Sequence, residues 1–174
     1  MRRVTYSVPS RLQGETLQIR LYDNRLVCYL GQQWVITLTR IYPKGRSERA
    51  KNIDYRHVIH SLHKKPQAFR YSQLRNELLP TLGYKIIWAH VDRTMAPRVA
   101  CKFIVGLLYL AATENCETEL AQTVLELIDD EKPLSLSSLQ SQFSKKAVVE
   151  VPVVKVEQHR LASYNRLIPQ HEVS

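Results

Sequence analysis

Residues 97–113 read PRVACKFIVGLLYLAAT and decide the fold of the larger part of the chain. Pro97 suits the first turn of a helix, and the residues after it are apolar nearly all round. Such a helix has to be enclosed by other elements, so the stretch predicts the centre of a helical core. Its apolar run from Val99 to Ala112 contains Lys102 and is shorter than the roughly 18–20 residues that span a bilayer. We therefore expect a buried helix and no membrane partner.

Helical patterns on both sides of this stretch predict an all-α domain over residues 54–143. Asp54 can cap a first helix that stops at Pro66, and Asn115 can cap the helix that follows the central one. The other predicted helices cover residues 67–79, 84–93 and 135–143.

Before residue 54 the apolar pattern has a period of two, which predicts a separate β domain over residues 1–53. The predicted strands cover residues 4–8, 15–22, 25–30 and 33–39. In three of these strands alternation places the apolar residues on one face. These residues are Leu17, Ile19 and Leu21 in one strand, Leu26, Cys28 and Leu30 in the next, which are expected to point inward, and Trp34, Ile36 and Leu38 in the last. Short strands joined by tight turns, too few for a sandwich, predict a small SH3-like β-barrel. The expected fold class is α+β, with a barrel, a helical domain and an extended tail.

The net positive charge of the chain lies entirely in its first 65 residues. Residues 1–65 hold 13 Lys and Arg against 4 Asp and Glu, a net charge of +9, whereas residues 66–174 hold 12 of each. Clustered Lys and Arg gain affinity for nucleic acid by releasing counterions from its phosphates. The residues predicted to bind DNA are Arg11, Arg20, Arg25, Arg40, Lys44, Arg46, Arg49, Lys51, Arg56, Lys64 and Lys65. A solvated basic surface that binds nothing remains the alternative.

The sequence shows no catalytic or metal-binding constellation. With 5 Gly it has no glycine-rich phosphate loop, and neither HExxH nor GxSxG occurs. Three histidines recur every third residue in basic surroundings, which favours packing or phosphate contact over metal binding: His57, His60 and His63. Three cysteines, far apart and odd in number, are expected to be buried in a reducing cytoplasm: Cys28, Cys101 and Cys116. We expect no metal and no cofactor.

Residues 144–174 form a tail of different character. Residues 148–156 of the tail are rich in β-branched side chains, but Pro152 excludes a central strand there. Its apolar residues are too many for a solvated terminus, so we predict an extended segment that docks on another surface. Folding back onto the chain's own helices is the alternative.

Three separated stretches, in this order, carry a resemblance to a known family: TYSVPSRLQGETLQIRLYDNRLVCYLG (residues 5–31), DYRHVIHSLHKKPQAFRY (54–71) and ACKFIVGLLYLAATENCETELA (100–121). The chain resembles, over nearly its whole length, the C-terminal part of IstA-type transposases. These are encoded by insertion sequences that also encode an AAA+ helper ATPase, IstB. In that family a helix-turn-helix region and an RNase-H-like core with acidic catalytic residues precede a small β-barrel and a helical region.

The resemblance implies a non-catalytic fragment of a DNA transposase, because none of the catalytic acids of that core has a counterpart in this sequence. It implies binding of double-stranded DNA at transposon ends during transposition, and contacts with other transposase subunits or the helper ATPase. Two alternatives remain open. One is a free-standing nucleic-acid-binding adaptor with no transposon role, and the other is a nuclease that uses acids of its own.

Overall fold

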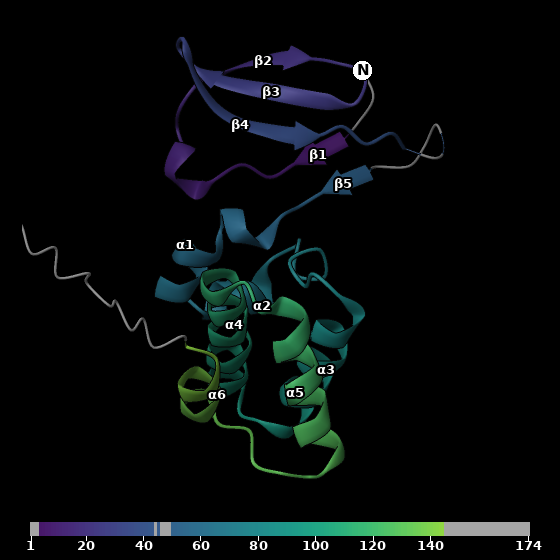
Figure 1. Cartoon of the computed structure of the whole chain (residues 1–174), viewed down its shortest axis with the longest axis vertical. Coiled ribbons are helices and arrows are strands. Elements are labelled where there is room, and N and C mark those ends of the chain that lie inside the picture. The colour runs from purple at the N-terminus through teal and green to yellow at the C-terminus, as the bar shows by residue number, and fades with distance from the viewer. Residues whose placement is uncertain (1–3, 44, 46–49, 145–174) are drawn as a thin grey trace, which may run out of the picture.

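Five short strands precede six α-helices in the computed structural model, which describes residues 4–43, 45 and 50–144. The predicted α+β class is confirmed. Figure 1 shows the strands above the helices. We call the described residues up to 53 the head and residues 54–144 the body. None of the helices in these described residues is long and apolar enough to cross a bilayer.

The head contains two sheets. An antiparallel sheet has the order β2-β3-β4, and a parallel pair joins β1 to β5. The bounds are β1 Val4–Tyr6, β2 Leu17–Leu21, β3 Arg25–Leu30, β4 Gln33–Thr39 and β5 Ala50–Asn52, with a 3-10 turn η1 at Ser10–Leu12. Side chains link the two sheets near the end of β4. The hydroxyl of Tyr6 accepts a hydrogen bond from the backbone N–H of Ile41 at 2.9 Å, and Asn52 donates to the carbonyl of Thr39 at 3.0 Å.

The predicted closed barrel is not found among the described strands. Strand β2 pairs with β3 alone and is an edge of its sheet. The apolar face predicted for this strand is largely open: Ile19 is 56% exposed and Leu21 61%, although Cys28, the partner of Ile19 on β3, is 1% exposed. The predicted alternation of apolar and polar residues along β2 is therefore not matched by an alternation of burial among the described residues.

A β-bulge corrects the predicted position of Trp34. The pairing runs from Cys28 with Ile36 to Tyr29 with Trp34, so the register shifts by one residue. The indole N–H of Trp34 donates to the hydroxyl of Thr37 at 3.1 Å. Because side chains alternate along a strand, Thr37 lies on the opposite face from Ile36. Trp34 thus belongs to the outer face of the sheet, and it is 63% exposed.

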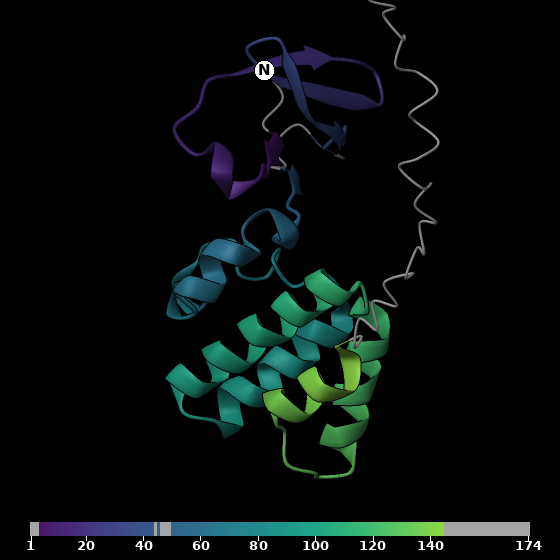
Figure 2. The same cartoon turned by 60° about the vertical axis from the view of Figure 1, so that its left-hand side comes forward.

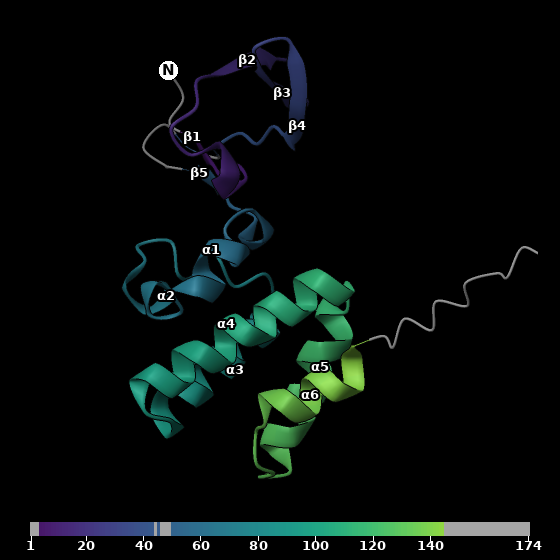
Figure 3. The same cartoon turned by 90° about the vertical axis from the view of Figure 1, so that its left-hand side faces the viewer.

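The body is built around α4. Its elements are η2 Tyr55–His57, α1 Ile59–Lys64, α2 Gln67–Tyr71, α3 Leu82–Thr94, α4 Pro97–Glu114, α5 Glu117–Asp129 and α6 Leu136–Phe143. Helix α4 contacts every other α-helix of the body. In Figures 2 and 3, α1 and α2 lie above α4, and the remaining helices lie below or beside it. The prediction of a central buried helix is confirmed, including Pro97 at its first turn.

Three helical segments differ from the prediction. The single helix predicted after Asp54 is divided into η2 and α1, and the side chain of Asp54 accepts the backbone N–H of Arg56 in η2. The predicted helix over residues 67–79 is shortened to α2, which ends at Tyr71 and is followed by turns as far as Pro80. Asn115 does not cap α5. It ends α4 in the left-handed conformation, with φ of 53°, a role that Asn tolerates better than most residues. Cys116 takes the position before α5.

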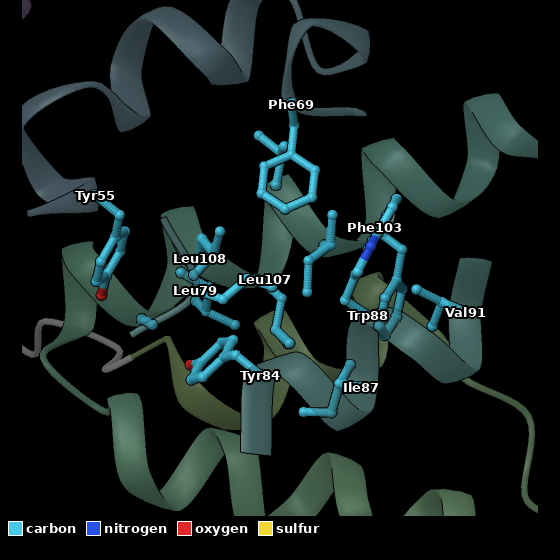
Figure 4. Packing of buried hydrophobic residues seen from close by; sticks show 14 of the residues in the cluster. Tyr55, Phe69, Leu79, Tyr84, Ile87, Trp88, Val91, Phe103, Leu107 and Leu108 are labelled. Atoms are coloured by element: carbon cyan, nitrogen blue, oxygen red, sulfur yellow. The ribbon is translucent and has the colours of Figure 1, made fainter. Parts of the chain in front are cut away.

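The apolar core lies between α4 and its neighbours (Figure 4). Leu107 and Leu108 of α4 are fully buried, as are Ile87 and Val91 of α3, and Figure 4 shows Val91 beside Trp88 and Phe103. Phe69 and Trp88 meet edge to face, with ring centroids 5.0 Å apart. Two of the cysteines are buried as predicted, and burial raises the pKa of each thiol: Cys28 and Cys101. Cys116 is half-buried.

The burial of α4 can be tested by truncating its side chains. Leu107→Ala or Leu108→Ala should lower the free energy of unfolding by about 2–5 kcal/mol, because each leaves a cavity in the core. Val99→Ala is a matched control, since Val99 lies on the same helix but is 53% exposed. Urea unfolding followed by circular dichroism measures all three. Leucine variants as stable as the valine variant would show that α4 is not the core.

Candidate nucleic-acid interface

The structure divides the eleven predicted DNA-binding residues into four groups. Lys44, Arg46 and Arg49 lie outside the described residues. Of the other three groups, the first lies at the three-stranded sheet. The second forms ion pairs with acidic residues of the body, and the third lies where η1 meets α1.

The first described group is a set of three arginines, each stacked on a tyrosine. The Cζ atom of Arg20 lies 4.8 Å from the ring centroid of Tyr29 on the neighbouring strand. The corresponding distances are 4.7 Å for Arg25 over Tyr22 and 4.7 Å for Arg40 over Tyr42. A guanidinium attracted to the face of a ring keeps N–H donors at its edge. These arginines are therefore held in place while they remain able to donate to a phosphate.

The turn between β2 and β3 positions two of these pairs. Tyr22 and Arg25 flank the turn, and the backbone N–H of Tyr22 donates to the carbonyl of Arg25 at 2.9 Å. The guanidinium of Arg40 donates to the carbonyl of Tyr22 at 2.8 Å, and the hydroxyl of Tyr42 donates to the carbonyl of Asp23 at 2.7 Å. Residues after β4 thus clamp the turn, and three arginine–tyrosine pairs gather on one small sheet.

We call the side of this sheet that carries Arg20, Arg25, Tyr29, Trp34 and Thr37 the outer face. Within the described part of the chain, no carboxylate forms an ion pair with Arg20, Arg25 or Arg40. Among the described residues, the positive charge of these arginines is therefore not offset by an ion pair.

Lys51 and Arg56 are engaged differently, because each pairs with an acid of the body. Lys51 on β5 bonds to Glu77, and Arg56 donates to the Oε2 atom of Glu117 at 2.9 Å. The same oxygen accepts the hydroxyl of Tyr55 at 2.8 Å. Burial, with the contact to Glu117 next, raises the pKa of Tyr55, so this hydroxyl stays protonated. The sequence predicted both cations to be DNA-binding residues. Their acidic partners are distant in the chain, so the ion pairs could not be recognised from the sequence.

Arg11, Lys64 and Lys65 are exposed near the junction of η1 and α1. The hydroxyl of Ser61 lies 3.0 Å from that of Ser10, which places η1 beside α1. These three residues belong to η1 and to the end of α1, not to the three-stranded sheet.

The three histidines take part in packing. The Nδ1 atom of His57 lies 2.8 Å from the hydroxyl of Ser7, which also accepts the backbone N–H of Asp54 at 2.8 Å. His63 stacks on Tyr109 with centroids 4.3 Å apart, and His60 meets the same ring edge-on. The described residues contain no group of three His, Cys, Asp or Glu that could hold a metal ion.

Sequence reasoning missed the aromatic members of the site. A signal for one of them is present, because the spacing in Arg40-Ile41-Tyr42 places Arg and Tyr on the same side of an extended chain, and these two residues do stack. No comparable pattern in the sequence predicts that Trp34 is exposed, because its exposure depends on the β-bulge.

No protein-family model matches the chain. No solved structure matches it significantly. A protein of Sinorhizobium fredii (strain NBRC 101917 / NGR234), described as uncharacterized protein y4jA/y4nE/y4sE, is 36% identical over 168 residues. The match covers 97% of this chain and 33% of that protein, so the chain spans about a third of the length of this relative.

The pair of Lys51 and Glu77 should make stability depend on pH. The hydrogen bond from Lys51 lowers the pKa of Glu77, so the pair stabilises the fold above the ordinary Glu pKa and ceases to do so as pH falls through the lowered value. Glu77→Gln should cost roughly 0.2–1 kcal/mol near neutral pH, and less at about pH 3, which is below the ordinary Glu pKa. Urea unfolding at both pH values measures the difference.

Glu126→Gln is the control, because Glu126 is exposed on α5 and forms no ion pair with the described residues. A cost for Glu77→Gln that is the same at both pH values would contradict the assigned pair.

Proposed function

We propose that this chain is the non-catalytic C-terminal region of an IstA-type transposase, and that its head binds the backbone of double-stranded DNA. The observation that carries the proposal is the net charge of +9 over residues 1–65, three of whose arginines stand on one sheet with no acidic partner among the described residues.

The geometry of the outer face suits phosphate binding. Arg20 and Arg25 stand on hydrogen-bonded strands, so the spacing of their charges is set by the sheet. Each rests on a tyrosine ring, which limits the conformational entropy that the side chain loses when it binds a phosphate. Contacts of this kind position a protein on DNA without reading its sequence. The binding we propose is therefore salt-dependent and weakly sequence-specific.

The assignment to a transposase is supported by the resemblance of residues 5–31, 54–71 and 100–121 to the IstA family. The relative in Sinorhizobium fredii is about three times as long as the match, which is compatible with a longer protein that contains such a region. In this proposal the DNA is a transposon end. The body and the tail contact other transposase subunits or the AAA+ helper ATPase. Tail residues 145–174 lie outside the described residues.

We also propose that the head belongs to a barrel of the SH3-like kind. The exposed Ile19 and Leu21 of edge strand β2 support this, because burying them takes a further strand or segment over that edge. In the resembled family the chain just before this region contributes to the barrel, and such a segment would complete it here.

DNA binding is tested most directly by removing the charges that have no structural role. Arg20→Gln and Arg25→Gln together should weaken binding to a duplex and reduce the slope of log affinity against log salt by about 2, at ~0.9 for each lost phosphate contact. Fluorescence anisotropy with a labelled duplex over a series of salt concentrations measures the slope. Arg40 is left intact, because it also holds the turn.

Lys85→Gln with Lys102→Gln is a control of equal charge change, since both lysines are exposed on the body. We expect this control to leave the slope nearly unchanged. If the two double variants behave alike, the binding is a response to overall charge and the proposed site is wrong.

We further expect this chain alone to cut and join no DNA. Phosphoryl transfer of the transposase type needs carboxylates that hold metal ions, and in the resembled family these lie in a separate core. Purified protein incubated with transposon-end DNA and Mg²⁺ or Mn²⁺ should leave the strands intact on a denaturing gel. Nicking that follows the protein through its purification would instead support a nuclease that uses acids of its own.

A further inference from the structure

Trp34 occupies an unusual position for the largest type of side chain. It is 63% exposed on the outer face, and its indole N–H is already bonded to Thr37 at 3.1 Å. Exposing so large an apolar surface forgoes the stabilisation that burial would bring. The bond to Thr37 fixes the orientation of the ring, so that one of its faces is presented in a constant direction.

The neighbours of Trp34 are aromatic and cationic. Tyr29 is its pairing partner across the bulge, and the guanidinium of Arg20 covers the ring of Tyr29 at 4.8 Å. Strands β4 and β2 lie two strand spacings, or roughly 9.5 Å, apart. The residue of β2 in line with Trp34 is Gln18, and Arg20 stands two residues further along that strand. A flat aromatic ring thus lies within a short distance of a positive charge that has no acidic partner among the described residues.

We propose that Trp34 stacks against an unpaired base, and that the outer face therefore prefers DNA with a single-stranded segment over a continuous duplex. This inference rests on the proposed DNA binding. In a duplex each base is stacked between its neighbours and cannot reach a ring on a flat sheet. In a single strand, aromatic side chains beside positive charges stack with bases whatever the sequence. Trp34 supplies the ring, and Arg20 contacts a phosphate of the same strand.

The test compares single-stranded and duplex DNA in the full chain. Trp34→Ala should weaken binding to an oligothymidylate of about 12 nucleotides by about 5- to 150-fold, the effect expected for one lost base stack. Its affinity for a duplex should fall by a much smaller factor, and the salt slope of that affinity should stay the same, because the substitution removes no charge. Trp34→Phe retains a ring and should restore most of the single-strand affinity.

Tyr71→Ala is the matched control. Tyr71 is an aromatic residue of the body, 82% exposed, and its loss should change neither affinity. Circular dichroism and thermal melts establish that all variants are folded. The intrinsic fluorescence provides a second measurement, because the other tryptophan, Trp88, is 7% exposed. Oligothymidylate should quench the emission of the original chain strongly and that of Trp34→Phe weakly.

The outcomes separate this inference from the proposed function. An equal loss of single-strand and duplex affinity in Trp34→Ala, or no loss of either, overturns the stacking role and leaves backbone binding intact. If Arg20→Gln with Arg25→Gln changes neither affinity, the proposed function itself fails, whatever Trp34 does.

Discussion

Helix α4 has to be enclosed on nearly every side, because its buried residues run without a break from Phe103 to Leu108. Consecutive side chains of an α-helix point in different directions around its axis, so one partner helix cannot cover all of them. The α-helices of the body each contact α4, and α6 comes close enough at Gly106 that a Cβ there would meet Leu136. The arrangement of the body follows from the need to remove this one helix from water.

The head is joined to the body by polar contacts and by Ile53, which packs against the apolar core of the body. The continuous apolar core begins at Tyr55 and contains no strand residue, whereas the head has a small buried group of its own that includes Leu12 and Cys28. Between them lie the bond of Ser7 to His57, the bond of Ser10 to Ser61 and the pair of Lys51 with Glu77. Contacts of these kinds each stabilise by about 1 kcal/mol or less. The position of the head thus depends on several weak contacts acting together.

The separation of charge between head and body also decides which cations are available to a ligand. Acids of the body engage Lys51 and Arg56 at the junction, where the two cations serve the fold. The arginines of the three-stranded sheet stand away from these acids and rest on tyrosines instead. Stacking holds a guanidinium without cancelling its charge, which an ion pair would do. One basic sequence cluster therefore divides into a structural part and a part suited to binding phosphates.

The sequence by itself determined the α+β class, most of the helices and the position of α4, because these follow from local periodicity and from caps such as Pro97. It also determined that the net positive charge lies in the first 65 residues. Only the tertiary structure decided that the strands form two sheets, that β2 is an edge and that a bulge turns Trp34 outward. It likewise decided that Glu77 and Glu117 engage two of the predicted binding residues. Register, edges and ion pairs bring together residues that are distant in the chain, and local patterns carry no information about such distances.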